Sequence, residues 1–124
     1  MQPADTQQTP TLAEAGRRAV EVVDPSGDQG TEDFLIRFED RDEPISALQE
    51  SIEQEIDEAV GAIDPDGTDA AVQMCGAVVT YLAFRRDEIT DVREDILRLA
   101  ARAEFDGEPP VLVRDWLEAE GVAL

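Results

Sequence analysis

The sequence predicts an all-α protein, a small bundle or array of five to six helices. Apolar residues recur at steps of three or four along most of the chain, and helix caps and turn residues separate these periodic segments at short intervals. The 124 residues are 42% hydrophobic, which suffices for one aliphatic core. We expect residues 11–124 to form a single helical domain without an evident internal repeat. The polar residues 1–10, which include two prolines, are expected to form a disordered tail.

The first helix is expected to begin after Thr11, because Thr11 and Glu14 have the spacing of a capping box. Valines near the end of this segment lower its preference for helix, so a short strand near residues 18–23 is the alternative. One proline and two glycines then predict a loop over residues 24–30. Thr31 has the residue type expected of an N-cap, here for a short second helix.

The most regular periodicity predicts one helix from Pro44 to Ile63. A proline fits the first turn of a helix, and the sequence Asp-Pro-Asp-Gly at residues 64–67 ends it. The apolar face is made of Ile45, Leu48, Ile52, Ile56, Val60 and Ile63. The opposite face is acidic and carries Glu50, Glu53, Asp57 and Glu58. We interpret the acidic face as a solvated surface, because di-iron carboxylate bundles require Glu-x-x-His pairs and the chain has no histidine.

The next segment is predicted to be the central helix of the fold. Thr68 is its expected N-cap, and the helix should run to about Asp87. Apolar residues surround nearly its whole circumference, which is typical of a helix buried on all sides. Gly76 would let a neighbouring helix approach closely. Cys75 is expected to behave as a small apolar core residue.

Two further helices complete the predicted array. One begins at Thr90 or Asp91 and ends near Gly107. Its expected apolar face is Val92, Ile96, Leu99, Ala100 and Ala103, with Leu97 beside it. The last helix runs from about Pro110 to Glu120. Its inward residues are expected to be Leu112, Val113, Trp116 and Leu117.

The charge of the chain is its most unusual property. Thirty acidic residues face ten basic ones, and the net charge is −20; all ten bases are arginine. In dilute buffer such repulsion destabilises a compact state, whereas at molar salt the Debye length falls to about 3 Å. The composition resembles that of haloarchaeal proteins, which implies a habitat rather than a family. We expect a cytoplasmic protein without a secretory signal or a membrane-spanning segment.

The residue inventory argues against most catalytic chemistries. General-base catalysis usually relies on histidine and Schiff-base chemistry on lysine, and the chain has neither. Cys75 has no histidine to activate it and lies in an apolar segment, whereas catalytic thiolates need electropositive, partly exposed settings. We therefore predict a protein that is not an enzyme and holds no cofactor.

One short string offers an enzymatic alternative. The sequence Asp-Pro-Asp-Gly-Thr at residues 64–68 resembles the D-x-D-G-T motif of the haloacid dehalogenase superfamily, which implies Asp64 as a phosphate-attacking nucleophile. In that family the motif follows a buried strand, whereas here it follows a helical pattern. Asp64, Asp66 and Asp69 are also the weak candidates for a cation site, since hard cations prefer oxygen ligands. We favour a turn that leads into the next helix.

Interaction with another protein is therefore the leading functional hypothesis. The segment from Ala70 to Phe84 is unusually apolar for so small a bundle, so part of it is expected to contact a partner protein or a second copy. The candidate contact residues are Val79, Leu82, Phe84 and Trp116. The alternative is a nucleic-acid-associated regulator. Its candidate residues are Arg85, Arg86, Arg93, Arg98 and Arg102.

Overall fold

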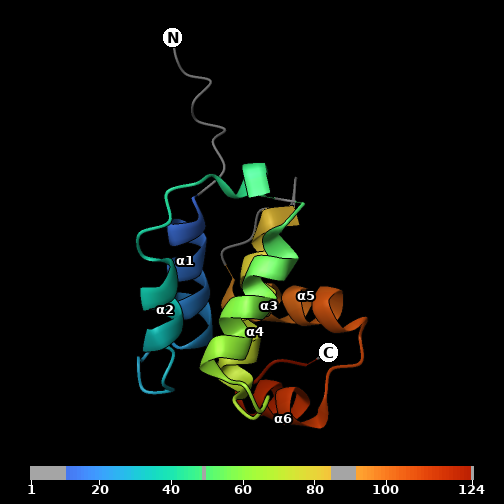
Figure 1. The fold of residues 1–124 in the computed structure, drawn as a ribbon. Helices are drawn as coiled ribbons and strands as arrows, with labels where there is room; N and C mark the ends of the chain where they lie inside the picture. Colours follow the sequence, from blue (N-terminus) through green and yellow to red (C-terminus); the bar gives the residue numbers. More distant parts are fainter. Residues whose placement is uncertain (1–10, 49, 85–91, 124) are drawn as a thin grey trace.

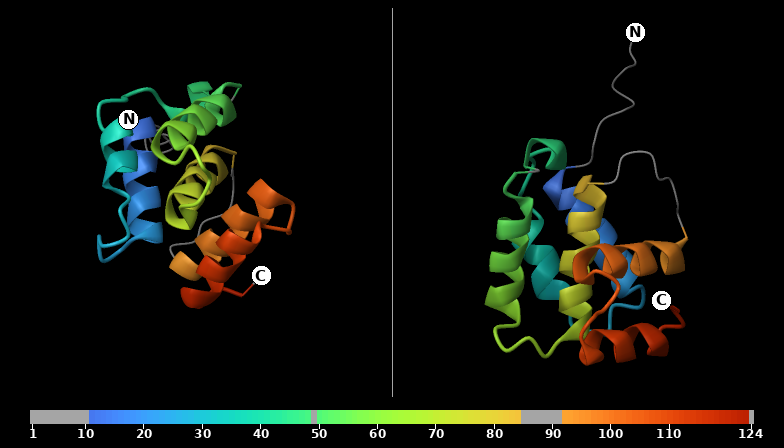
Figure 2. Two further views of the ribbon diagram at one scale, coloured as in Figure 1. Left: turned by 60° about the horizontal axis from the view of Figure 1, so that its bottom comes forward. Right: turned by 90° about the vertical axis from the view of Figure 1, so that its right-hand side faces the viewer.

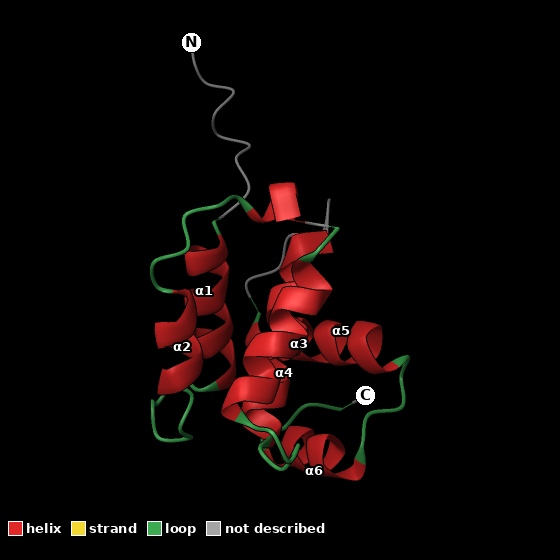
Figure 3. Cartoon of the chain, in the orientation of Figure 1, coloured by secondary structure: helices red, strands yellow, loops and turns green. Residues whose placement is uncertain are grey.

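The computed structural model describes residues 11–48, 50–84 and 92–123 and shows an array of helices joined by turns (Figures 1 and 3). The helices are α1 (Leu12–Val23), α2 (Glu32–Phe38), α3 (Ile52–Ile63), α4 (Ala70–Phe84), α5 (Arg93–Phe105) and α6 (Val111–Ala119), with a 3₁₀ helix over Ile45–Leu48. No strand occurs in these ranges beyond an isolated bridge between Thr11 and Pro44. The all-α prediction is confirmed. The expected disordered tail over residues 1–10 lies outside the described residues.

Helix α4 is the centre of the array, as its apolar circumference predicted. It packs against α1, α3, α5 and α6, and ten of its fifteen residues are buried. Helices α1 and α2 pack against each other on one side of it (Figure 1). Helices α5 and α6 run across α4 on the other side (Figure 2). The core cluster draws on all six helices, so one continuous core holds the array together.

In the α1–α2 pair and in the α3–α4 pair, a glycine brings the two helices close together. A Cβ atom on Gly76 of α4 would lie 2.9 Å from the Cγ2 atoms of both Ile56 and Val60 on α3. A Cβ atom on Gly16 of α1 would lie 3.2 Å from Cβ of Phe38 on α2. The close approach expected at Gly76 is therefore confirmed, and Gly16 has a similar role that the sequence did not suggest.

The first four helices form two hairpins with the same turn. The sequence Asp-Pro-x-Gly follows α1 at residues 24–27 and follows α3 at residues 64–67, an offset of 64 − 24 = 40 residues. The C-cap residues adopt nearly equal dihedral angles, φ −134° and ψ 65° at Asp24 against φ −133° and ψ 68° at Asp64. Gly27 and Gly67 both take a positive φ, which favours glycine. The shared feature is confined to this turn, because the helices on either side of it share few identical residues.

The predicted capping box at the start of α1 is confirmed. The Glu14 amide donates to the Thr11 hydroxyl at 3.1 Å, and the Thr11 amide donates to the Glu14 carboxylate at 2.9 Å. Residues 18–23 are helical, so the strand alternative is wrong. The valines favour a strand only locally, and burial of Val22 and Val23 against the core outweighs this preference.

The helix expected from Pro44 to Ile63 is interrupted. Ile45–Leu48 forms a 3₁₀ helix, and α3 begins only at Ile52. The preceding segment is tied to the start of α1, where the amides of Leu12 and Ala13 donate to the carbonyls of Glu43 and Arg41 at 2.8 and 2.9 Å. These bonds satisfy two free amides of α1 and direct the chain across its end, so it turns again before α3 can begin.

Of the two predicted N-caps, Thr31 is confirmed in position and Thr68 is wrong. Asp69, not Thr68, caps α4, because its carboxylate accepts a hydrogen bond from the Val72 amide at 3.2 Å. Thr31 does precede α2, but its side chain makes no cap and its hydroxyl donates to the Asp24 carboxylate at 2.9 Å. In both turns a buried aspartate accepts hydrogen bonds from the threonine predicted as the N-cap: Asp24 from the Thr31 hydroxyl and Asp64 from the Thr68 amide.

The faces of the last two helices also differ from the predicted ones. On α5 the buried residues are Ile96, Leu97, Ala100 and Ala101, whereas Val92 and Ala103 are exposed. On α6 Val113 and Leu117 are buried, Trp116 is half-buried and Leu112 is exposed. The predicted ends of α4 at Asp87 and of α5 at Thr90 or Asp91 lie outside the described residues.

Candidate functional site

The outer side of α6 carries the largest group of exposed apolar side chains on a single helix of the described chain. Val111 is 63% exposed and Leu112 is 39% exposed, and Trp116 lies one turn beyond Leu112 with its ring partly accessible. Asp115 lies between them and is exposed. We call this surface the α6 face (Val111, Leu112, Asp115 and Trp116). Since the opposite side of α6 is buried in the core, the helix is apolar on both sides.

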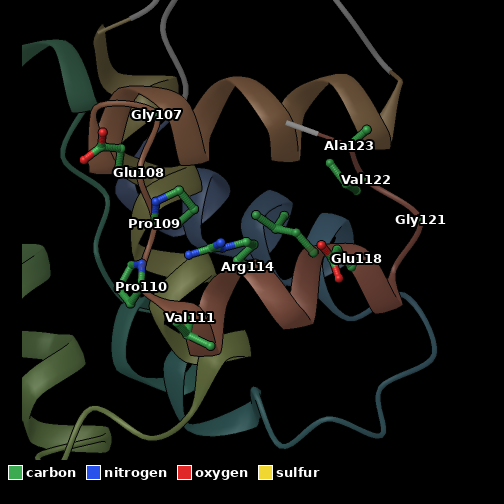
Figure 4. A pocket seen from close by; sticks show the side chains of 11 residues that line it. Gly107, Glu108, Pro109, Pro110, Val111, Arg114, Glu118, Gly121, Val122 and Ala123 are labelled. Carbon is green, nitrogen blue, oxygen red and sulfur yellow. The ribbon is translucent and has the colours of Figure 1, made fainter.

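A groove of about 840 Å³ runs along one flank of α6. It lies between the Pro109–Pro110 linker, the helix and the segment that follows it. Figure 4 shows Arg114 reaching along this groove, with Pro109, Pro110 and Val111 at one end and Glu118 and Val122 at the other.

A second groove, of about 640 Å³, lies on the other flank of α6. Leu112, Asp115 and Trp116 line it from α6, and Gln29 and the first residues of α4 line it from the opposite side. The α6 face therefore lies between two grooves, and such a shape is expected of a surface that contacts another molecule.

Hydrogen bonds of Trp116 and of Arg93 on α5 connect α6 with the end of α1 and the loop that follows it. The Trp116 indole nitrogen donates to the side-chain oxygen of Gln29 at 2.7 Å. The Arg93 guanidinium donates to the carboxylate of Glu120, directly after α6, at 2.6 Å. It also donates to the carbonyls of Val22 and Val23. The position of α6 therefore depends on hydrogen bonds as well as on its buried side.

The loop that carries Gln29 is organised around the buried carboxylate of Asp24. This carboxylate accepts hydrogen bonds from the amides of Gly27, Asp28 and Gln29 and from the Thr31 hydroxyl, at 2.9 to 3.1 Å. Burial by itself raises the pKa of Asp24, but these hydrogen bonds outweigh it and hold the pKa below the ordinary aspartate value. The loop is thus built to keep an ionised carboxylate, and it fixes Gln29 in place.

The turn after α3, which holds the candidate cation ligands, is organised around Asp64 in the same way as the turn after α1 is organised around Asp24. Asp64 accepts hydrogen bonds from the Thr68 and Asp69 amides at 3.0 and 2.8 Å, and a further one from Gln73. Burial raises the pKa of Asp64 and these hydrogen bonds lower it, with a net decrease. Asp69 caps α4, and Asp66 is exposed. Among the described residues, no group of three or more carboxylates, thiols or imidazoles is arranged to hold a metal ion.

The four predicted partner residues do not form one surface. Val79 is fully buried, so the structure removes it from any contact surface. Leu82 is half-buried and Phe84 is 42% exposed. Both lie near the end of α4 that is remote from Trp116, and a helix of fifteen residues is about 22 Å long. Only Trp116 belongs to the α6 face.

The predicted arginine cluster is described only in part, over Arg93, Arg98 and Arg102. Arg85 and Arg86 lie outside the described residues. Arg93 is engaged by the end of α1 and by Glu120, as described above. Arg98 pairs within α5 with Glu94 at 3.7 Å and with Asp95. Arg102 is exposed.

A small acidic pocket is a feature that sequence reasoning missed. Glu53 and Asp57 of α3, Thr80 of α4 and Glu104 of α5 line a cavity of about 140 Å³. Burial raises the pKa of Glu104, and the charges of Asp57 and Glu53 raise it further. No periodicity within one helix indicates such a pocket, because it depends on how α5 crosses α3 and α4.

The thiol of Cys75 lies in the core. It is fully buried, and burial, with smaller contributions from Asp24 and Asp69, raises its pKa far above the ordinary value for cysteine. The thiol is therefore protonated and inaccessible, as expected of a core residue.

Comparison with known proteins gives no assignment. No family model, no curated protein and no solved structure matches the chain. None of the helices over the described ranges is both long enough and apolar enough to cross a membrane.

Proposed function

We propose that the protein is a non-catalytic helical interaction module that self-associates through the α6 face in the salt-rich cytoplasm of a halophile. The observation that carries this proposal is the exposure of Val111 and Leu112 beside the partly accessible Trp116. Clustered exposed apolar side chains mark contact surfaces in globular proteins. Tryptophan in particular is enriched among residues that dominate binding energy.

The charges of α6 favour a second copy as the occupant. A two-fold symmetric contact requires a surface that complements itself. On α6 the base Arg114 is followed by the acids Asp115 and Glu118, and all three are exposed. Two α6 helices packed antiparallel about an axis near residue 114 would bring Leu112 of each copy toward Trp116 of the other. In this register Asp115 of each copy lies beside the Arg114 of the other. The two Arg114 side chains also approach each other, and concentrated salt screens both interactions.

The size of the surface favours a weak, reversible dimer. A stable specific interface buries about 800 Å² per partner and involves roughly twenty or more residues. The nine residues of α6 and the walls of its two grooves make up the smaller part of such an area. The net charge of −20 adds repulsion between copies. Association is therefore expected to need concentrated salt, which screens that repulsion.

The residue chemistry supports a role without catalysis. The chain has no histidine and no lysine, and its one thiol is buried and protonated. Of the two aspartates in the D-x-D-G-T resemblance, Asp64 is buried and accepts hydrogen bonds from the Thr68 and Asp69 amides in the turn after α3, whereas Asp66 is exposed. These hydrogen bonds leave Asp64 poorly placed to attack a phosphate.

Substitution of Leu112 tests the proposal. In 2 M KCl we expect the wild type to show a concentration-dependent monomer–dimer equilibrium by sedimentation velocity. Leu112→Gln should raise the dissociation constant on the order of tenfold or more, because it removes an apolar contact from both copies. Ile36→Gln is the matched control, since Ile36 is 56% exposed on α2 and lies outside the α6 face.

The control variant should associate like the wild type. Equal weakening by the two substitutions would assign the effect to general surface hydrophobicity, against the proposal. A wild type that sediments as a strict monomer at high concentration in 2 M KCl would overturn self-association altogether.

A further inference from the structure

Gln29 contacts Trp116, the aromatic residue of the α6 face, from a distant part of the chain. Its side-chain oxygen accepts the hydrogen bond from the Trp116 indole at 2.7 Å, and its side-chain nitrogen donates to the Val23 carbonyl at 3.4 Å. The indole N–H can only donate, so the amide oxygen of Gln29 must be the end that faces it. Both ends of the glutamine amide are thus used.

The backbone of Gln29 is held as firmly as its side chain. Its amide donates to the buried Asp24 carboxylate at 3.0 Å, within the group of hydrogen bonds that organises the turn after α1. Gln29 is half-buried, and it lines the same groove as Leu112 and Trp116. The glutamine is therefore a fixed point against which the indole is oriented.

We infer that Gln29 is a positioning residue of the self-association surface, because it holds the Trp116 indole in the orientation that a second copy contacts. This inference rests on the proposed function. A partly exposed tryptophan without a hydrogen-bond partner can populate several staggered rotamers. If only one of them fits the partner, the apparent affinity falls by the fraction of molecules in that rotamer. A two-fold dimer uses two indoles, so the loss applies twice.

Two substitutions of Gln29 separate positioning from packing. Gln29→Met keeps the length of the side chain and removes the acceptor, whereas Gln29→Glu keeps an acceptor oxygen. Gln54→Met is the matched control, because Gln54 is an exposed glutamine on α3 whose side chain donates to the neighbouring Glu58 at 3.4 Å. Trp116 is the only tryptophan, so its fluorescence reports on the indole alone.

The measurements are made in 2 M KCl on full-length protein. Gln29→Met is expected to shift the emission and lower the anisotropy of Trp116 at concentrations where the protein is monomeric. It should also raise the dimer dissociation constant about three- to tenfold by sedimentation. Gln29→Glu is expected to restore both properties toward the wild type, and Gln54→Met should leave both unchanged.

Unchanged Trp116 fluorescence in Gln29→Met would overturn the inference. An unchanged dissociation constant alongside altered fluorescence would also overturn it, while leaving self-association intact. A monomeric wild type would overturn the proposed function itself, and the inference with it. Circular dichroism of each variant identifies a general loss of folding, and recovery in Gln29→Glu cannot come from such a loss.

Discussion

At the scale of single residues, this fold depends on the buried carboxylates of Asp24 and Asp64, whose burial sequence patterns do not predict. Asp24 and Asp64 are buried acids in a chain with three acids for every base, yet each is satisfied by amides of its own turn. The turns were predictable from proline and glycine. The burial of their first residue was not, because aspartate before proline is also common in exposed turns.

Gly76 is expected to be the least replaceable residue of the α3–α4 contact. Gly76→Ala would place a methyl group 2.9 Å from two side-chain carbons of α3, so the helices must separate or the side chains must move. Overpacking of this kind destabilises proteins by about 1–3 kcal/mol. Urea unfolding in 3 M KCl measures the change.

Gly61 provides the control for this substitution. It lies within α3, and a Cβ atom there would meet nothing within 4 Å. Gly61→Ala should therefore stabilise the protein by about 0.5–1 kcal/mol, the usual helix preference for alanine. A destabilisation of the same size in both variants would contradict the close-contact explanation for Gly76.

At the scale of elements, the predictable helices were those whose local signals agree with their packing. The capping box of α1 and the apolar circumference of α4 are local properties, and both predictions hold. The interruption before α3 was not predictable, because it arises from hydrogen bonds to the start of α1. The face of α5 was predicted in part. Ile96 and Ala100 are buried as expected, whereas the crossing with α4 buries Ala101 and leaves Ala103 exposed.

The prediction of the candidate site was partial for a similar reason. Leu112 and Trp116 were both assigned to the inward side of the helix, and Trp116 was also a candidate contact residue. Leu112 is exposed, whereas Trp116 is half-buried and packs against the core. A helix that is apolar on both sides gives one broad signal, and sequence alone does not divide it into a buried and an exposed half. Gln29 gave no signal, because its partner lies 87 residues away.

Burial beside the charges of Asp57 and Glu53 on α3 makes Glu104 of α5 a destabilising residue at neutral pH. Its pKa is raised, so the folded state binds its proton more tightly than the unfolded chain does. This contribution favours folding below the ordinary glutamate pKa and is lost as the pH rises through the raised value. Glu104→Gln should therefore increase the free energy of unfolding at pH 7 and reduce its dependence on pH between about 4 and 7.

The comparison variant for this test is Glu21→Gln, which removes an exposed acid from α1. Denaturant unfolding at 0.5 and 3 M KCl should give a larger gain for Glu104→Gln than for Glu21→Gln, and the difference should shrink in the higher salt. Equal gains at both positions would indicate that only net charge matters and that the acidic pocket has no special role.

At the scale of the whole molecule, the surface has two opposing effects on association between copies. Thirty acids keep copies apart in dilute buffer, while the exposed apolar side chains of α6 draw them together once the charges are screened. An association driven by charge attraction weakens with salt, whereas this one should strengthen. The sign of the salt dependence therefore distinguishes the two kinds of contact.

The most direct measurement is the dimer dissociation constant of the wild type as a function of KCl, from about 0.5 to 3 M, by sedimentation equilibrium. Circular dichroism on the same samples defines the range over which the helices stay folded. Within that range we expect the dissociation constant to fall steadily as KCl rises, and Leu112→Gln to remove most of the association. A dissociation constant that rises with KCl, or a protein that remains monomeric throughout, would contradict the account.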